Sequence, residues 1–317
     1  MKKAARLIFL LLLIVGTIWI LRRTDSPYQK NEGSVFGTTY HITYQSPSDF
    51  HPEIMAELQR VDDALSLFNK KSWLSRFNAG EKPAANAMAE EVISLAMRVS
   101  SETQGAFDIT VAPLVNAWGF GYKSGQWPTD AEVDSLRQIV GYERYARGER
   151  VMLDCGAIAK GYGVDRVARL LKHHGVKNYM VEIGGEVVVS GCNSSGEPWK
   201  IGVARPTDQT NAVQEIIPMA EGALATSGNY RNYHTDSLGR RVAHTIDPRL
   251  GHPVQQSLLS ATVLAPTCAE ADAYATAFMV MGLDEARKFV EAHHDLKVFF
   301  IYNKEDNTLG IYRTIPE

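Results

Sequence analysis

The sequence predicts a protein of the α+β class, with a single compact domain of mixed antiparallel sheet and helices behind an apolar amino-terminal segment. Helical and strand patterns are mixed without strict βαβ repeats, and Gly184-Gly185 lies between two apolar runs, as in a two-residue hairpin. The chain has 317 residues, 45% hydrophobic and 22% charged, so it can bury a sizeable core. This balance excludes a disordered, collagen-like or coiled-coil protein.

Charge and cysteine content exclude further classes of function. The 33 lysines and arginines nearly balance 36 acidic residues, and the net charge is −3. A nucleic-acid partner is therefore not expected. The three cysteines are far apart and show no CxxC spacing, so the sequence indicates neither a disulfide framework nor a zinc site.

The amino-terminal segment, residues 1–23, is predicted to be a membrane anchor or a signal peptide. Its uncharged run at residues 7–21 is short against the ~20 apolar residues that span a bilayer. Arg22-Arg23 follows the run where a cleavage site would need small residues, which favours a retained anchor. Basic residues are more numerous before the run than after it, which favours a cytoplasmic amino terminus and an exported body.

Beyond this segment we expect a polar linker at residues 24–34 and one domain at residues 35–317, because no repeat or long hinge interrupts the rest. The first half of the domain combines strand alternation with helical periodicity and capping signals. The elements expected here are a strand at 38–44, a helix that begins at Pro52 with an apolar face reaching Phe68, helices at 89–102 and 129–141, a strand at 150–153, and a helix ending at Gly175.

The second half is predicted to consist mostly of strands. Those that flank Gly184-Gly185 cover residues 179–183 and 186–189. A capping box at 267–270 begins a helical pair that Gly282 interrupts. The remaining strands are expected at 199–204, 223–226, 242–246, 260–264, 297–302 and 310–313.

Common catalytic signatures are absent from the sequence. It contains no GxxxxGK[ST], no GxGxxG between strand and helix, no HExxH and no GxSxG. Nucleotide hydrolases of the P-loop type, Rossmann enzymes, zincins and serine hydrolases therefore lose support. The candidates for chemistry are four polar, glycine-rich stretches.

The first two stretches suit a flat ligand and a phosphate group. At 105–111, with 118–121 behind it, glycines lie beside aromatic residues, and Asp108 could hold a ribose or a ring N–H. Asp108 could equally cap a local turn. At 153–163 an acid, Asp154, and Lys160 flank small residues at the start of a helix, where free N–H groups and a cation favour phosphate. An ordinary strand-to-helix turn capped by Asp154 is the alternative.

The third stretch, residues 225–233, with 244–248 beyond it, combines hydroxyls, amides, an arginine and aromatic rings. This chemistry suits an anionic aromatic ligand. A solvated hairpin is the alternative, and His244 alone is more often a structural histidine than a base.

The fourth stretch places Asp272 and Thr276 four residues apart in a small-residue helix. They therefore share one face, one turn apart. A carboxylate and a hydroxyl are hard oxygen ligands of the kind that Mg²⁺ takes from proteins, alongside waters or substrate phosphates. Polar residues on the surface of a helix are the alternative.

Taken together, these stretches resemble the ApbE-type FAD:protein FMN transferases. The resemblance extends from about residue 35 to the carboxyl end and rests on ordered motifs: GTTY, LSLFNKKSWLSRFN, GAFDITVAPL, WGFG, LDCGAIAKGYGVD, EIGGE, TSGNYRNY, HTIDPRLGHP and EADAYATAFMVMG. It implies an exported, Mg²⁺-dependent enzyme that splits FAD, releases AMP and attaches FMN through a phosphoester to a threonine or serine. The targets would be flavoprotein subunits of membrane redox pumps, and the location the periplasmic side of the inner membrane.

The resemblance also implies site residues. The flavin-binding positions fall on Phe36, Phe68, Ala106, Phe107, Asp108, Asp154, Lys160 and Ile246, and the metal positions on Ala157, through its carbonyl, Asp272 and Thr276. Phe36 stands where methionine is common and Phe68 where tyrosine is common, so stacking on the flavin would survive without the tyrosine hydroxyl.

The expected reaction is an in-line displacement at the FMN-side phosphorus, with Mg²⁺ neutralising charge on the phosphates. The attacking hydroxyl needs a base, for which His244 is the candidate and Asp247 its substitute. Two alternatives stay open. Water could attack instead, giving an FAD pyrophosphatase, or the protein could be a membrane-tethered flavin carrier without catalytic activity.

Overall fold

The structure is a computed structural model that describes Leu13 and residues 26–121, 127–206, 213–228, 233–235, 241–306 and 308–315. Apart from Leu13, the predicted anchor at residues 1–23 lies outside the described residues. Among the residues that are described, none of the helices combines the length and the apolar character that a membrane span requires.

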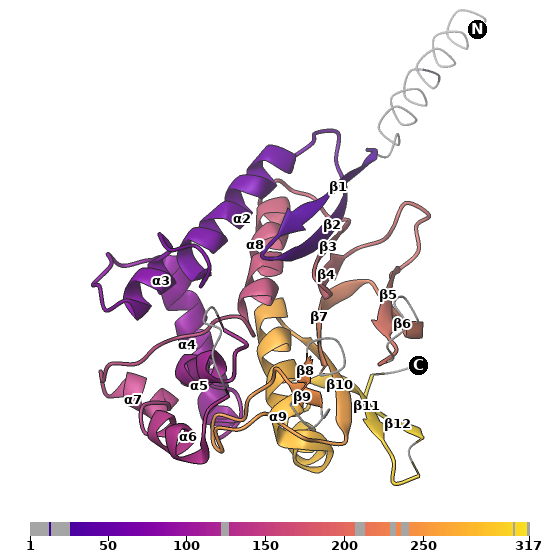
Figure 1. Ribbon diagram of the computed structural model, residues 1–317. Helices are drawn as coiled ribbons and strands as arrows, with labels where there is room; N and C mark the ends of the chain where they lie inside the picture. Colours follow the sequence, from indigo (N-terminus) through magenta and orange to yellow (C-terminus); the bar gives the residue numbers. More distant parts are fainter. Residues whose placement is uncertain are drawn as a thin grey trace, which may run out of the picture.

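One antiparallel sheet of eight strands forms the middle layer of the domain (Figure 1). Its strand order is β1-β2-β3-β4-β7-β10-β11-β12. The strands are β1 (Tyr28–Val35), β2 (Thr38–Gln45), β3 (Tyr179–Ile183), β4 (Glu186–Ser190), β7 (Glu221–Gly228), β10 (Leu258–Ala265), β11 (Lys297–Asn303) and β12 (Leu309–Arg313). Two small sheets pair β5 (Trp199–Ala204) with β6 (Val213–Met219), and β8 (Tyr233–Thr235) with β9 (Arg241–Ala243).

Helices cover one face of this sheet (Figure 1). Helix α8 packs on β3 and β4, and α9 packs on β7 and β10; α2 then lies against α8, and α4 against α9. The helices are α2 (His51–Leu65), α3 (Trp73–Asn78), α4 (Ala87–Glu102), α5 (Ala112–Ala117), α6 (Asp130–Arg137), α7 (Tyr142–Ala146), α8 (Ala159–His173) and α9 (Cys268–Ala292), with a 3-10 turn at Ile109–Val111.

Apolar side chains fill both faces of the sheet. On the helical side, one core lies around α4, α9, β10 and β11 and a second around α2, α8, β2 and β3. On the opposite face, the β5–β6 sheet covers a third core that includes Trp199, Leu224 and Phe299. These layers confirm the predicted α+β domain with an antiparallel sheet.

Local signals in the sequence had the expected structural effect at three places. Both hairpin glycines adopt positive φ, 64° at Gly184 and 104° at Gly185, as a tight turn between twisted strands requires. The capping box of α6 forms at Thr129 and Glu132. Gly282 interrupts α9 with φ 75° and ψ 179°, so α9 is the predicted helical pair.

Several predicted boundaries were wrong. Residues 28–34, expected in the linker, belong to β1, which pairs with β2 over its full length. The helix expected to extend from 129 to 141 ends at Arg137. Strand β6 was not predicted, and Ile246 forms only an isolated bridge with Pro253 beyond β9.

The strand predicted at 150–153 does not form, although Val151 and Leu153 are buried. The side chain of Asn78 makes the hydrogen bonds that a neighbouring strand would make. Its Nδ2 donates to the Leu153 carbonyl and its Oδ1 accepts from the Leu153 N–H, both at 2.8 Å.

Helix α2 ends at Leu65, so Phe68 does not continue its apolar face. The Ser66 Oγ accepts from the Phe68 and Asn69 amides, at 3.3 and 3.1 Å, and these bonds turn the chain away from the helix. Phe68 is consequently 80% exposed.

Candidate active site

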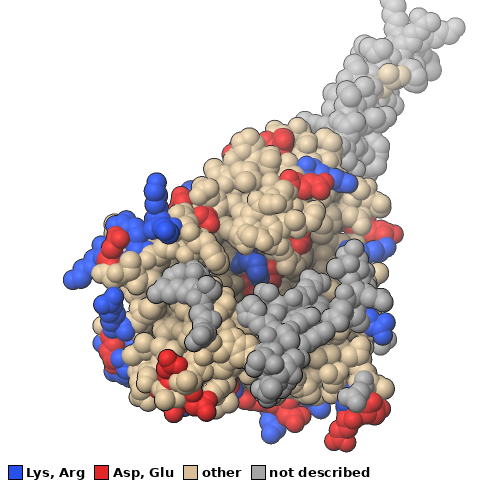
Figure 2. Space-filling view, viewed as in Figure 1, with Lys and Arg blue, Asp and Glu red and all other residues tan. Residues whose placement is uncertain are grey.

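A cavity of about 900 Å³ lies where loops from both halves of the chain meet the amino-terminal ends of α8 and α9. Figure 2 shows a hollow on this face, with basic and acidic side chains visible inside it. Every flavin and metal position implied by the family resemblance lines the cavity, as does His244. Its volume lies in the upper part of the range of small-molecule sites, which suits a ligand as large as a dinucleotide.

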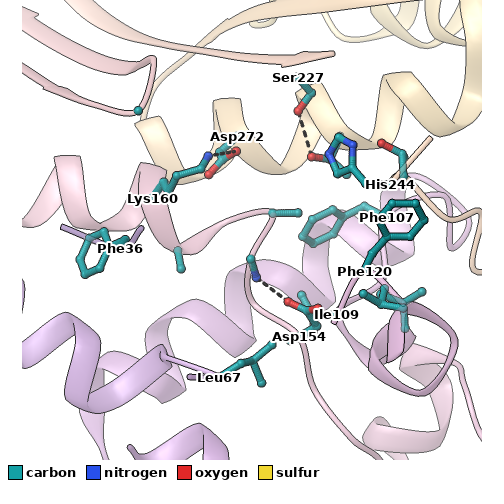
Figure 3. A pocket seen from close by; sticks show the side chains of 18 of the residues that line it. Phe36, Leu67, Phe107, Ile109, Phe120, Asp154, Lys160, Ser227, His244 and Asp272 are labelled. Carbon is teal, nitrogen blue, oxygen red and sulfur yellow. Dashed lines mark hydrogen bonds and ion pairs between the residues drawn. The ribbon is translucent and has the colours of Figure 1, made fainter. Parts of the chain in front are cut away.

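Three charged groups form one wall of the cavity. Lys160, in the first turn of α8, places its Nζ 2.7 Å from the Glu186 Oε1. The same Nζ lies 3.8 Å from the Asp272 Oδ1, as the dashed line in Figure 3 marks. The carboxylates are almost fully buried, with side chains 2% and 4% exposed, whereas the Lys160 side chain is 31% exposed. We call this group the Lys160 cluster.

Burial and mutual charge shift the pKa values within the Lys160 cluster. Burial and the negative charge of Asp272 raise the pKa of Glu186, and the Lys160 ammonium at 2.7 Å opposes this rise by stabilising the carboxylate. Burial alone lowers the pKa of Lys160, but the two carboxylates outweigh it and raise that pKa above its ordinary value. Lys160 is therefore a cation at every physiological pH.

Asp272 also joins the two helices that frame the cavity. Its Oδ2 accepts from the Gly161 amide of α8 at 3.1 Å. In return, the Asp165 carboxylate of α8 accepts from the Cys268 and Ala269 amides at the start of α9, each at 2.9 Å. Each helix thus supplies a carboxylate to the free N–H groups of the other.

Thr276 lies one turn beyond Asp272 on α9, and both line the cavity. The Thr276 Oγ1 is 3.0 Å from the Ser227 Oγ at the end of β7. In the described part of the chain no three His, Cys, Asp or Glu side chains gather as a metal cluster. A protein site for Mg²⁺ needs only one or two carboxylates, and the carboxylate of Asp272 and the hydroxyl of Thr276 are oxygen donors that fit this ion.

Aromatic and small apolar residues form the remaining walls. Phe107 and Phe120 lie beside His244 in Figure 3, and the Phe120 and His244 ring centroids are 6.4 Å apart. Phe36 lies in the tight turn between β1 and β2 with a positive φ of 52°, a strained conformation for this residue. Phe68 reaches the cavity as an exposed ring.

The two acids predicted to contact the flavin also make local backbone contacts. Asp108 is 5% exposed, and its oxygens accept from the Thr110 and Tyr142 amides at 2.8 and 2.7 Å. The local cap left open by the sequence is therefore present through Thr110, and the second oxygen makes a long-range bond to Tyr142. The Asp154 Oδ1 accepts from the Gly156 amide at 2.8 Å, and burial raises the pKa of Asp154.

The structure brings His244 to the cavity but not Asp247. The Asp247 Oδ2 pairs with the Arg249 guanidinium at 3.0 Å, and its Oδ1 accepts from the Arg249 amide at 2.8 Å. Asp247 is 4% exposed and does not line the cavity, so the geometry does not favour it as a substitute base. Residues 229–232 of the third stretch lie outside the described residues.

Among the cavity-lining residues to which sequence reasoning gave no individual role are Glu186, Ser227 and Phe120. Each stands inside a quoted motif, EIGGE, TSGNYRNY or WGFG. The signal for Glu186 was a carboxylate directly after a glycine hairpin, followed in its strand by three valines.

Comparison with solved structures shows that the fold is that of a flavin transferase. Flavin transferase ApbE from Vibrio cholerae superposes with a TM-score of 0.80 at 37% identity, covering 90% of this chain and 97% of that one. The apo form of Pseudomonas stutzeri flavinyl transferase ApbE gives 0.80 at 30% identity, with 92% and 96% covered.

Relatives of known sequence give the same result. The FAD:protein FMN transferase of Vibrio cholerae is 38% identical over 93% of this chain and 94% of its own length. That of Escherichia coli is 34% identical over 87% and 84%. The model of the ApbE family matches residues 36–300, and this chain belongs to the ApbE family.

Proposed function

We propose that this protein is an FAD:protein FMN transferase that cleaves FAD and attaches FMN to a threonine or serine of a target flavoprotein. The observation that supports it is a single cavity in which aromatic walls and the Lys160 cluster occur together. The aromatic walls suit an isoalloxazine ring, and a lysine at a helix start suits the pyrophosphate. The relatives in Vibrio cholerae and Escherichia coli are named for this reaction.

In the proposed reaction, the acceptor hydroxyl oxygen forms a bond to the FMN-side phosphorus. The bond from that phosphorus to the bridging oxygen breaks, and the bridging oxygen leaves with AMP. The proton of the hydroxyl passes to the imidazole of His244, which lines the same cavity. Lys160 orients the phosphates by its charge, and Phe107 and Phe120 exclude water from the flavin side.

Mg²⁺ fits the donors at this wall. The Asp272 carboxylate, the Thr276 hydroxyl and the Ala157 carbonyl would hold it, and all three residues line the cavity. When bound, Mg²⁺ would supply positive charge to the phosphate oxygens as the leaving group departs.

We further propose that residues 7–21 anchor the protein in the inner membrane with the domain on the periplasmic side. The basic residues before this run support that orientation. Flavoprotein subunits of membrane redox pumps would then be acceptors within reach.

The test is mass spectrometry of a candidate acceptor flavoprotein after coexpression with this protein. We expect one FMN attached to a threonine or serine, together with release of AMP when the purified proteins are mixed with FAD and Mg²⁺. AMP release that is just as fast without the acceptor would identify an FAD pyrophosphatase. Binding of FAD with no release of AMP under either condition would identify a flavin carrier.

A further inference from the structure

Glu186 is a buried carboxylate that forms one ion pair in the described part of the structure, with Lys160. Its Oε1 receives the Lys160 ammonium at 2.7 Å. Its Oε2 is buried, and within the part of the chain that the structure describes no donor forms a hydrogen bond to it. Buried charges are costly unless they are paired, so the ion pair with Lys160 is the interaction through which this carboxylate can act.

The position of Lys160 matters because the Asp272 carboxylate lies close both to the Lys160 ammonium and to the Gly161 amide. Lys160 Nζ lies 3.8 Å from the Asp272 Oδ1, beyond hydrogen-bonding distance, while the Asp272 Oδ2 is held by the Gly161 amide. Oδ1 is therefore the oxygen left for a divalent cation. An ammonium that moved onto Oδ1 would occupy this oxygen and repel the incoming cation.

We propose that Glu186 is a positioning residue that holds the Lys160 ammonium away from Asp272 and so keeps Oδ1 available for the divalent cation. This inference rests on the proposed function, because it takes Asp272 as a ligand of Mg²⁺. The negative charge of Glu186 would offset the positive charge of Lys160, so that a lysine and a metal ion can lie side by side at one phosphate site.

Direct ligation of the metal by Glu186 would be a different arrangement, and a double-variant cycle separates the two. If Glu186 acts through Lys160, removing the ammonium should cancel the effect of removing the carboxylate. If Glu186 binds the metal itself, removing its carboxylate should weaken metal binding whether or not Lys160 is present.

The experiment measures binding of Mn²⁺, as a spectroscopic substitute for Mg²⁺, to the full chain by electron paramagnetic resonance without FAD. The variants are Glu186→Gln, Lys160→Met and the double variant. Glu221→Gln, an exposed carboxylate on β7 outside the cavity, is the matched control. Thermal unfolding of each variant checks that the fold is retained.

We expect Glu186→Gln to weaken Mn²⁺ binding by about 10- to 100-fold, the usual effect of removing a group that positions a metal ligand. Lys160→Met should bind Mn²⁺ at least as tightly as the wild type, and the double variant should return to the level of Lys160→Met. A raised Mg²⁺ concentration should also restore much of the turnover of Glu186→Gln.

A double variant that binds as weakly as Glu186→Gln would overturn the inference, and so would unchanged binding in Glu186→Gln itself. Wild-type protein that bound no Mn²⁺ would instead refute the metal part of the proposed function, and the inference with it. The two failures are therefore distinguishable in one data set.

Discussion

The two carboxylate oxygens of Asp272 have different surroundings, and we propose that each has its own role. Oδ2 accepts from the Gly161 amide at 3.1 Å, and Oδ1 lies 3.8 Å from the Lys160 Nζ, where we propose that a divalent cation binds. In Asp272→Asn the amide oxygen can still accept from Gly161, but the charge for a metal is lost. We expect FMN transfer to fall by about 100-fold or more, because a metal contributes several kcal/mol to such a step. The measurement is FMN incorporation across a Mg²⁺ titration.

Asp272→Ala is the companion variant. It should abolish metal-dependent transfer too, but it also leaves the buried Gly161 amide unpaired, at a cost of about 1–3 kcal/mol of stability. Its Tm should therefore lie below that of Asp272→Asn. Normal transfer by Asp272→Asn at all Mg²⁺ concentrations would show that the metal assignment is wrong.

His244 is the candidate base. Replacing it by alanine should lower the rate of FMN transfer by about 10²- to 10⁴-fold, the range for loss of a general base, with little change in the KM for FAD. His252→Ala is the control, since this exposed histidine packs on Trp118 with ring centroids 5.7 Å apart and does not line the cavity. A rate within a few fold of wild type in His244→Ala would remove His244 from this role.

At the scale of residues, the sequence could predict which side chains line the cavity, but not what else they contact. Asp108 illustrates the reason, because its second oxygen accepts from the Tyr142 amide, 34 residues away. Asp247 pairs with Arg249 only two residues on, yet either direction of that side chain was compatible with the sequence. Partners of this kind are set by tertiary packing.

At the scale of elements, the crossing of α8 and α9 determines the shape of the site. Asp272 of α9 caps α8, and Asp165 of α8 caps α9, so the two amino-terminal ends that frame the cavity are fixed to each other. Each cap is also favoured by the positive end of the helix dipole. The helices can approach this closely because position 161 has no side chain.

Gly161→Ala tests this crossing. A Cβ at Gly161 would lie 2.9 Å from the Ala269 Cα and closer still to the Cys268 carbonyl oxygen, both of them backbone atoms. We expect a loss of about 1–3 kcal/mol of stability, typical of overpacking, together with a rise in the Mg²⁺ concentration needed for transfer. The measurements are Tm and a Mg²⁺ titration.

Gly163→Ala, two residues along α8, is the comparison. There the closest atom is Phe36 Cε2 at 2.7 Å, at the end of a side chain that can rotate away. This variant should lose less stability than Gly161→Ala and should change the affinity for FAD rather than for metal. Equal effects of the two substitutions on stability and metal dependence would contradict the role given to the helix crossing.

Element prediction succeeded where local chemistry decided the outcome and failed where long-range pairing did. Capping residues marked the starts of α6 and α9 correctly, and Gly282 marked the interruption of α9. The extended segment at 150–153 has strand-like residues, but Asn78 takes the hydrogen bonds of Leu153. Strand β1 was missed because all but one of its residues are exposed or half-buried, and they resemble a polar linker until β2 pairs with them.

At the scale of the whole molecule, the sheet brings distant motifs together. The Lys160 cluster takes one residue each from α8, β4 and α9, and its partners are 26 and 112 residues from Lys160 along the chain. The ordered motifs could predict the family and most cavity residues. They could not predict that Glu186 and Asp272 flank one ammonium, because that depends on how α8 and α9 lie across the sheet.

The boundary of the domain gives a prediction for the whole chain. β1 begins at Tyr28 and pairs with β2 from Tyr28↔Gln45 to Val35↔Thr38, so the folded unit starts before the predicted boundary at residue 35. A chain beginning at Ser26 should keep the Tm and transfer activity of the full protein. It should also leave the membrane fraction if residues 7–21 are the anchor.

A chain beginning at Phe36 should behave differently, because it lacks β1 and the turn that holds Phe36 at the cavity. Each lost ladder hydrogen bond removes about 1 kcal/mol, so we expect a loss of a few kcal/mol and a raised KM for FAD. Thermal unfolding and FAD titration of both truncated chains provide the measurement. If the chain beginning at Phe36 matched the chain beginning at Ser26 in Tm and in FAD affinity, β1 would be dispensable and the domain would begin at β2. If both truncated chains were equally impaired, the segment before Ser26 would contribute to the fold. Because β1 covers an edge of the sheet rather than its core, the expected result is a weakened flavin site on a sheet that still folds.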